Sequence, residues 1–178
     1  MSSKINLEKI VFCPLSPELN VSEFSCANKE LTEFLIDGTA FEYQKNHLAQ
    51  TTCLLNEGKI VGYYSIMADA LKLSGREKEK MFKENKRIRS YPALKIARLA
   101  TDERYQGNGI GSLMVTVVKG FAVWLNENGV SIRFITVDSK KEVPEWYKQR
   151  GFIINQSEEE QKKRETISMR FDLYASVE

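Results

Sequence analysis

The chain has 178 residues, of which 42% are hydrophobic and 28% charged, and it carries a formal net charge of +2. This composition is typical of a globular protein and excludes an intrinsically disordered one, and the length suits a single domain over residues 1–178. The first residues lack the apolar stretch of a signal peptide, and no later run approaches the roughly 20 apolar residues that span a bilayer. We therefore expect a cytoplasmic protein with no membrane partner.

Cysteine and histidine are too few and too scattered to suggest a metal or redox centre. The three cysteines, Cys13, Cys26 and Cys53, are widely spaced, and His47 is the single histidine. An odd number of cysteines without a Cys-x-x-Cys pair argues against a disulfide framework and against structural zinc. We expect no bound metal. We expect each cysteine to pack as a small apolar residue, and His47 to lie at a helix end or on the surface.

The first half of the chain predicts a strand, two short helices and a hairpin. Residues 9–15 are strand-like, and Asn28 can cap a helical region that runs to about residue 47 with a break at Gly38. Two β-rich runs follow at residues 50–55 and 60–68, joined by a turn that contains a glycine. The helical residues expected to face inward are Leu31, Phe34, Leu35 and Phe41.

Residues 71–90 form a basic insertion between the hairpin and the next strand. They hold eight basic and three acidic residues, and the resulting net charge of +5 exceeds the +2 of the whole chain. Ser74 and Glu77 have the spacing of a helix capping box, which predicts a helix here. A solvated basic helix is the plainer interpretation, and contact with an anionic partner is the alternative.

The second half of the chain predicts alternating strands and helices. Strands are expected at residues 93–100, 132–137, 152–155 and 167–173, with a polar connection over residues 156–164. A strand, a helix and another strand in succession indicate a parallel pair. The order β-α-α-β-β-(α)-β-α-β-α-β-β predicts an α/β (α+β) fold, a mixed, mostly antiparallel sheet of about six to seven strands with helices on both faces.

The long helix after residue 109 is amphipathic and is expected to end at Gly129, a natural stop. Its apolar residues repeat at three- and four-residue spacing, which predicts one buried face. These residues are Ile110, Leu113, Met114, Val117, Phe121, Trp124 and Leu125. A second, shorter helix is predicted by Pro144, which suits a first turn, and by Gly151, which suits the position just beyond the last turn.

The stretch from Leu99 to Gly111 combines an apolar strand end, a glycine-rich turn and a helix start. Its three glycines keep side chains away, so backbone N–H groups and the positive end of the helix can approach a phosphate. A tight turn without a ligand is the alternative. A dinucleotide-binding fingerprint needs glycine where Ser112 stands, and a nucleoside triphosphate loop needs Gly-Lys-Ser or Gly-Lys-Thr, so neither pattern fits.

Gln106, Gly109 and Gly111 instead match Gln-x-x-Gly-x-Gly, and here the chain resembles the GNAT superfamily of acetyl-CoA-dependent N-acetyltransferases. The resemblance implies that the loop binds the pyrophosphate of acetyl-CoA and that the pantetheine arm pairs with the strand backbone beside Leu99 and Thr101. The cofactor-binding residues that it implies are Leu99, Ala100, Thr101, Gln106, Gly107, Asn108, Gly109, Ile110, Gly111 and Ser112.

A second motif runs from Pro144 to Phe152 and resembles the Phe-Tyr-x-x-x-Gly-Phe signature of the same family, with Trp146 in place of phenylalanine. Tyr147 is the candidate catalytic residue, because its hydroxyl is protonated at neutral pH and can return a proton to a departing thiolate whose pKa is about 8.5. A packing aromatic is the alternative role. Many family members place an asparagine seven residues before this tyrosine, where this chain has Lys140.

No carboxylate is marked by its sequence context as a general base. Deprotonating a lysine side chain at pH 7 costs roughly 4 to 5 kcal/mol, whereas an α-amine of pKa about 8 costs only about 1 kcal/mol. A substrate with an α-amine could therefore dispense with a base. The acidic residues that could serve as a base, or instead cap turns and meet solvent, are Asp69, Asp102, Glu103 and Asp138.

A wider similarity links the chain to a bacterial subgroup of GNAT toxins from toxin-antitoxin pairs. It rests on residues 24–26, Leu31, residues 34–35, Ala40, and residues 61–65, 91–92 and 97–100. This resemblance implies acetylation of the α-amine of aminoacyl-tRNA and neutralisation by an antitoxin with a ribbon-helix-helix domain. The sequence thus predicts transfer of an acetyl group from acetyl-CoA to a primary amine by direct attack. The alternatives are the aminoacyl-tRNA toxin and a catalytically silent acyl-CoA-binding module, and a homodimer stays open.

Overall fold

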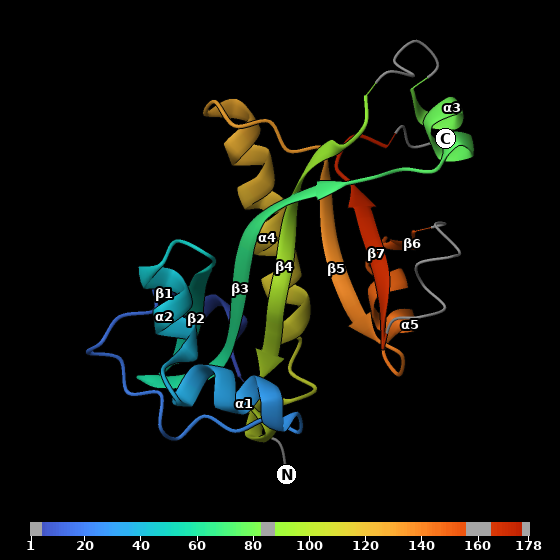
Figure 1. Ribbon diagram of the computed structural model, residues 1–178. Coiled ribbons are helices and arrows are strands. Elements are labelled where there is room, and N and C mark those ends of the chain that lie inside the picture. Colours follow the sequence, from blue (N-terminus) through green and yellow to red (C-terminus); the bar gives the residue numbers. More distant parts are fainter. Residues whose placement is uncertain (1–4, 83–87, 156–164, 176–178) are drawn as a thin grey trace. The chain divides into compact units, whose positions relative to one another are not determined.

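The computed structural model describes residues 5–82, 88–155 and 165–175. The chain divides into two compact units, which we call the first unit (Met1–Met67 and Ile96–Val118) and the second unit (Ala68–Lys95 and Lys119–Glu178). The described strands follow the order β1-β2-β3-β4-β5-β7-β6 (Figure 1). Strands β3 (Lys59–Leu71) and β4 (Tyr91–Thr101) and the long helix α4 (Ile110–Glu127) each have one part in each unit. This is the mostly antiparallel α/β fold that the sequence predicts.

The first unit holds the amino-terminal strands and helices. Its first strand is shorter than predicted, because a 3-10 turn occupies Leu7–Lys9. Strand β1 pairs antiparallel with β2, and β2 pairs antiparallel with β3, Gln50 lying opposite Ile66. The elements are β1 (Val11–Pro14), α1 (Lys29–Ile36), α2 (Thr39–Lys45), β2 (Gln50–Asn56), β3 (Lys59–Leu71, in part), β4 (Tyr91–Thr101, in part), a 3-10 turn (Glu103–Tyr105) and α4 (Ile110–Glu127, in part).

The two short helices form where local signals predict them. The side-chain oxygen of Asn28 accepts a hydrogen bond from the backbone N–H of Glu30 and caps α1, and Gly38 adopts a left-handed conformation that separates α1 from α2. Phe41 was expected to face inward, but 37% of its surface is exposed. That prediction was wrong because the short helix α2 buries the stripe that contains Ala40, and the next residue points about 100° away.

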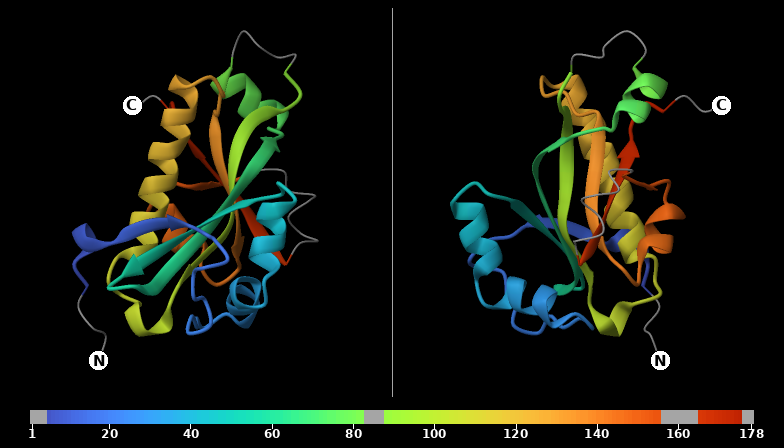
Figure 2. Two further views of the ribbon diagram at one scale, coloured as in Figure 1. Left: turned by 90° about the vertical axis from the view of Figure 1, so that its left-hand side faces the viewer. Right: turned by 45° about the vertical axis from the view of Figure 1, so that its right-hand side comes forward.

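Strand β3 carries helices of the first unit on both of its faces (Figure 2). Tyr63 points into an apolar cluster with Phe34 of α1, and its hydroxyl donates a hydrogen bond to the Leu31 carbonyl at 2.6 Å. The preceding residue, Gly62, faces the other side, where a Cβ would lie 3.1 Å from Ile110 of α4. Because successive strand residues alternate in direction, α1 and the start of α4 lie on opposite faces, as predicted.

The second unit contains the carboxy-terminal strands and two shorter helices. Within this unit, β5 runs in the same direction as the first part of β4 (residues 91–95), its neighbour in the strand order, as predicted for a strand, helix and strand in succession (Figure 1). It pairs antiparallel with β7, which also pairs with β6. The elements besides the remaining parts of β3, β4 and α4 are α3 (Gly75–Met81), β5 (Phe134–Lys140), α5 (Pro144–Lys148), β6 (Ile153–Ile154) and β7 (Thr166–Asp172).

The basic insertion forms the predicted helix α3 with its predicted capping box. Ser74 and Glu77 exchange side-chain to backbone hydrogen bonds at its start. Glu77 is also buried, and one of its carboxylate oxygens lies 2.7 Å from Nη1 of the buried Arg170 on β7. The helix is thus anchored to the second unit by an ion pair that its sequence pattern does not reveal, and the predicted insertion residues 83–87 and connection 156–164 lie outside the described residues.

Helix α4 ends at Glu127, and Gly129 follows with a φ of +103°, as predicted. Its buried face differs from the predicted one, because Phe121 and Trp124 are exposed, Trp124 by 52%. The helix is apolar around most of its circumference, so residue spacing does not single out one face. The residues that are buried are Ile110, Met114, Val115, Val118 and Ala122. None of the described helices is long and apolar enough to cross a membrane.

Candidate active site

The glycine loop lies in the first unit, between the end of β4 at Thr101 and the first residue of α4, Ile110. Gly107 and Gly109 have φ angles of +81° and +80°, a conformation that glycine adopts without strain. A Cβ on Gly107 would meet no atom within 4 Å, so the backbone there borders open space, whereas a Cβ on Gly109 would lie 3.5 Å from Cδ1 of Leu7. The first amides of a helix lack intrahelical acceptors, so α4 adds donors at the end of the loop.

Asn108 closes the glycine loop with its side chain. Its Nδ2 donates to the carbonyl of Tyr105 at 3.0 Å and to that of Gln106 at 3.5 Å, and its Oδ1 accepts from the backbone N–H of Ile5 at 3.2 Å. The contact with Ile5 spans 103 residues of sequence, so the sequence did not reveal it. The loop is therefore held in shape by its own side chain and by the amino-terminal segment.

The strand residues that lead into the loop are closely packed. Ala100 is buried, whereas Leu99 and Thr101 are half-buried. Gly62 on β3 allows the strands to approach, since a Cβ there would lie 3.0 Å from the carbonyl oxygen of Ala100. The first unit thus contains all of the predicted cofactor-binding residues, 99–101 and 106–112. They run from the end of β4 through the loop into the first turn of α4.

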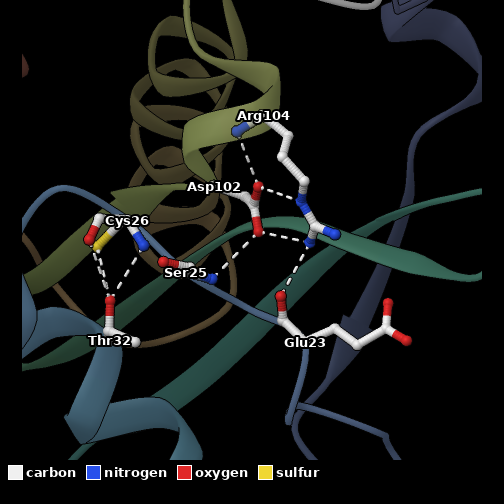
Figure 3. Close-up of polar contacts among 6 residues, drawn as sticks. All are labelled: Glu23, Ser25, Cys26, Thr32, Asp102 and Arg104. Carbon is white, nitrogen blue, oxygen red and sulfur yellow. Dashed lines mark hydrogen bonds and ion pairs between the residues drawn. The ribbon is translucent and has the colours of Figure 1, made fainter.

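Asp102, one of the four carboxylates considered as a base, follows the end of β4 and is fully buried. Figure 3 shows its polar contacts. Its oxygens accept hydrogen bonds from the Ser25 backbone N–H and from the backbone N–H, Nε and Nη2 of Arg104. Burial alone would raise its pKa, but the hydrogen bonds from Arg104 and Ser25 and the Arg104 charge outweigh burial and hold the pKa below its ordinary value. Asp102 is therefore a structural carboxylate and a poor proton acceptor.

The other three candidate carboxylates differ in their contacts and exposure. Asp69 accepts a hydrogen bond from the hydroxyl of Thr136, and Asp138 forms an ion pair with Lys95 at 2.6 Å. Glu103 is exposed in the 3-10 turn after β4. Within the described residues, no group of three or more His, Cys, Asp or Glu could hold a metal ion.

Tyr147 lies in the second unit on helix α5, which begins with Pro144 as predicted. Only 8% of its surface is exposed, and its ring packs edge-on against Trp146 and Phe152 at centroid distances of 4.9 and 5.5 Å. Burial raises the pKa of Tyr147 to about 12, and the charge of Arg150 opposes this only in part. The hydroxyl therefore keeps its proton at neutral pH.

Two cations hold the end of this helix: Lys119, which the sequence motifs do not mark, and Arg150, which lies within the second motif and suits the end of a helix. Lys119 on α4 donates from Nζ to the carbonyl of Arg150 at 2.7 Å, and the same ammonium lies 3.6 Å from the ring centre of Phe171. The Arg150 guanidinium lies 3.6 Å from the ring centre of Trp146 and donates to the Trp146 carbonyl. Burial, and next the charge of Arg150, lower the pKa of Lys119. Lys140, at the position where many family members have asparagine, is exposed at the end of β5.

Comparison with known proteins identifies the class. A sequence model described as an acetyltransferase (GNAT) domain matches residues 25–173, so the chain belongs to the GNAT acetyltransferases. It is an acetyl-CoA-dependent acyltransferase, and the glycine loop suits the cofactor because open space borders its positive-φ backbone at Gly107. No curated protein matches the chain by sequence.

Solved structures share the fold. AtaT complexed with acetyl-methionyl-tRNAfMet is 21% identical, with 92% of this chain and 94% of that chain covered and a TM-score of 0.75. A tyrosine-to-phenylalanine mutant of the AtaT toxin, bound to the C-terminus of the antitoxin AtaR and acetyl-CoA, is 20% identical, with coverages of 92% and 93% and a TM-score of 0.71. A tyrosine-to-phenylalanine mutant of KacT is 18% identical, with coverages of 91% and 95% and a TM-score of 0.73.

Proposed function

We propose that the protein transfers the acetyl group of acetyl-CoA to a primary amine by direct attack, with Tyr147 as the general acid. Two observations carry this proposal: the Gln-x-x-Gly-x-Gly loop has Gly107 and Gly109 at positive φ, and the same chain holds a buried tyrosine whose pKa is raised to about 12. A silent acyl-CoA-binding module would need neither a protonated tyrosine nor the side chains that hold its helix. We propose that both units belong to one catalytic domain.

The roles of the residues follow from what acyl transfer needs. Acetyl-CoA supplies an activated acetyl thioester when bound. The backbone amides from Gly107 to Ser112 and the positive end of α4 bind its pyrophosphate, and the end of β4 over residues 99–101 offers backbone groups to the pantetheine arm. Tyr147 Oη holds a proton for the leaving sulfur, and its apolar surroundings keep that proton in place until it is needed.

The α-amine of aminoacyl-tRNA is the acceptor that we favour as a second, finer proposal. Three of the four carboxylates considered as a base are engaged in hydrogen bonds or ion pairs, and an α-amine is the acceptor that most easily dispenses with a base. The exposed Lys72, Arg76 and Lys80 on and beside α3 suit a phosphate backbone. The fold shared with AtaT, solved with acetyl-methionyl-tRNAfMet, supports the same choice.

Such a toxin would act in the cytoplasm and would need an antitoxin. We propose a ribbon-helix-helix antitoxin encoded beside this protein, and the structure of AtaT with the C-terminus of the antitoxin AtaR supports an antitoxin partner. Expression of the wild-type chain should then arrest bacterial growth, and expression of Tyr147→Phe should not. Growth without arrest would contradict the toxin while leaving the acetyltransferase intact.

A side-by-side measurement of thiol release from acetyl-CoA tests both proposals. The acceptors are aminoacyl-tRNA, a polyamine, an aminoglycoside and a peptide amine, with the deacylated tRNA and an N-formylated aminoacyl-tRNA as matched controls. Release with aminoacyl-tRNA and with neither control supports the α-amine. Release with another amine alone contradicts the tRNA proposal, and no release with any amine despite measurable CoA binding contradicts acetyl transfer.

A further inference from the structure

A buried carboxylate joins the start of the glycine loop to a distant part of the first unit. Asp102 lies between the end of β4 and the loop, and its oxygens accept four hydrogen bonds from Ser25 and Arg104 (Figure 3). Arg104 Nη2 also donates to the carbonyl of Glu23 at 2.9 Å, and the Glu103 N–H donates to the carbonyl of Ser25 at 2.9 Å. Residues 102–104 and residues 23–25 are thereby joined by hydrogen bonds in which each segment donates to the other.

The same contacts continue in both directions along the chain. Toward the loop, the Tyr105 N–H donates to the Asp102 carbonyl, and the Tyr105 carbonyl accepts from the side chain of Asn108. Toward α1, the Cys26 N–H donates to Thr32 Oγ1 at 3.0 Å, and that hydroxyl donates back to the Cys26 carbonyl at 3.2 Å (Figure 3). A continuous path of hydrogen bonds and backbone therefore links the glycine loop to the first helix.

We propose that Asp102 and Arg104 are positioning residues of the acetyl-CoA site, which fix where the glycine loop begins and couple its occupancy to the segment that leads into α1. The inference rests on the proposed binding of the acetyl-CoA pyrophosphate by the loop. A loop that binds through backbone amides has no side chain of its own to aim at the ligand, so the residues that set its starting point determine its fit.

The charge and shape of the pair make this role specific. Only a planar guanidinium offers Nε and Nη2 to the two carboxylate oxygens while reaching the Glu23 carbonyl. An asparagine at position 102 would turn a donor toward the donors of Ser25 and Arg104. A lysine at position 104 could keep the charge but reach fewer of these acceptors.

The test combines CoA titration calorimetry with hydrogen–deuterium exchange on the full chain. Asp102→Asn should weaken CoA binding about tenfold, since hydrogen bonds to a charged group are lost, and Arg104→Lys should fall between wild type and Arg104→Gln. In wild type, CoA should slow amide exchange in peptides that cover residues 22–32, and Asp102→Asn should abolish that response. Arg104→Gln, in which a half-exposed side chain changes, serves if Asp102→Asn does not fold.

Tyr63→Phe is the matched control for stability. It removes the hydrogen bond from the Tyr63 hydroxyl to the Leu31 carbonyl in the same unit, and Tyr63 takes no part in the hydrogen bonds described for Asp102 and Arg104. It should lower the unfolding temperature while leaving the affinity for CoA unchanged. The inference is overturned if Asp102→Asn and Arg104→Gln bind CoA like wild type, or if Tyr63→Phe weakens binding as much as they do. Wild-type protein that fails to bind CoA would instead overturn the proposed function, and this inference with it.

Discussion

The glycine loop of the first unit and the tyrosine helix of the second are held in place by different kinds of interaction. The loop is shaped by hydrogen bonds, from Asn108 within it and from the buried Asp102 and Arg104 pair before it. Helix α5 is held by aromatic rings and by the cations Lys119 and Arg150. The difference follows from the task, because a phosphate needs exposed backbone donors in fixed positions, whereas a general acid needs surroundings that favour its neutral form.

The largest expected effect comes from removing the hydroxyl in the tyrosine region. Tyr147→Phe should lower kcat about 100-fold or more, the usual contribution of general acid catalysis, and leave CoA affinity within about twofold of wild type. The ring contacts with Trp146 and Phe152 persist in the variant, so the unfolding temperature should change little. Steady-state thiol release measures this effect, and unchanged turnover would remove Tyr147 from the chemistry.

The next largest effect comes from straining the backbone of the glycine loop. Gly109→Ala places a side chain at a φ of +80°, where a non-glycine residue is strained by about 1 to 2 kcal/mol. We expect the Kd for CoA to rise about tenfold, because relief of the strain moves the backbone donors. Gly58→Ala is the control, since its φ of +77° lies in the β2–β3 turn. Equal weakening of CoA binding by both variants would show that the glycine loop has no special role.

A smaller effect is expected from the support of the tyrosine helix. Lys119→Met removes the hydrogen bond to the Arg150 carbonyl and the contact with the Phe171 ring, while keeping an unbranched side chain of similar length. We expect kcat to fall about three- to tenfold with the KM for acetyl-CoA unchanged, because a loosely held acid protonates less efficiently. Lys148→Met, which breaks the exposed pair with Glu145, should leave both constants unchanged. A change in KM with constant kcat would contradict the account.

The smallest effect is the response to alkaline pH. The acid must be protonated, so its activity declines only as pH rises through its pKa, which burial raises from 10 to about 12. With an α-amine acceptor, already neutral above its pKa of about 8, kcat should stay level from about pH 9 to 10. A pH profile under conditions where the chain stays folded measures this, and a halving of kcat near pH 10 would indicate an ordinary, solvent-exposed tyrosine.

The sequence predicted those parts of the molecule that depend on neighbouring residues. Asn28 caps α1, Gly38 separates two helices, and Ser74 forms a capping box, because each signal acts within one turn of chain. The glycine loop and the tyrosine helix were recognised for the same reason. The family match over residues 25–173 confirms the class that these motifs implied.

What the sequence could not predict depends on residues that meet only after folding. The Ser25 to Asp102 hydrogen bond spans 77 positions, and Lys119 lies within a helix whose spacing gives no sign of a partner. Asp102 was considered as a base because its sequence context does not reveal that its oxygens are taken. The buried face of α4 was misassigned because apolar residues surround that helix, and only packing selects the face with Val118 and Ala122.

We propose that the glycine loop binds the cofactor and that Tyr147 acts in the chemical step. The double variant Gly109→Ala with Tyr147→Phe tests this division of roles most directly. Because the two residues act on separate steps, their effects on kcat/KM should add as free energies within about 0.5 kcal/mol, and the double variant should bind CoA like Gly109→Ala and turn over like Tyr147→Phe. A double variant no worse than one of its parents in kcat/KM, or a Tyr147→Phe variant that loses CoA binding, would contradict the claim.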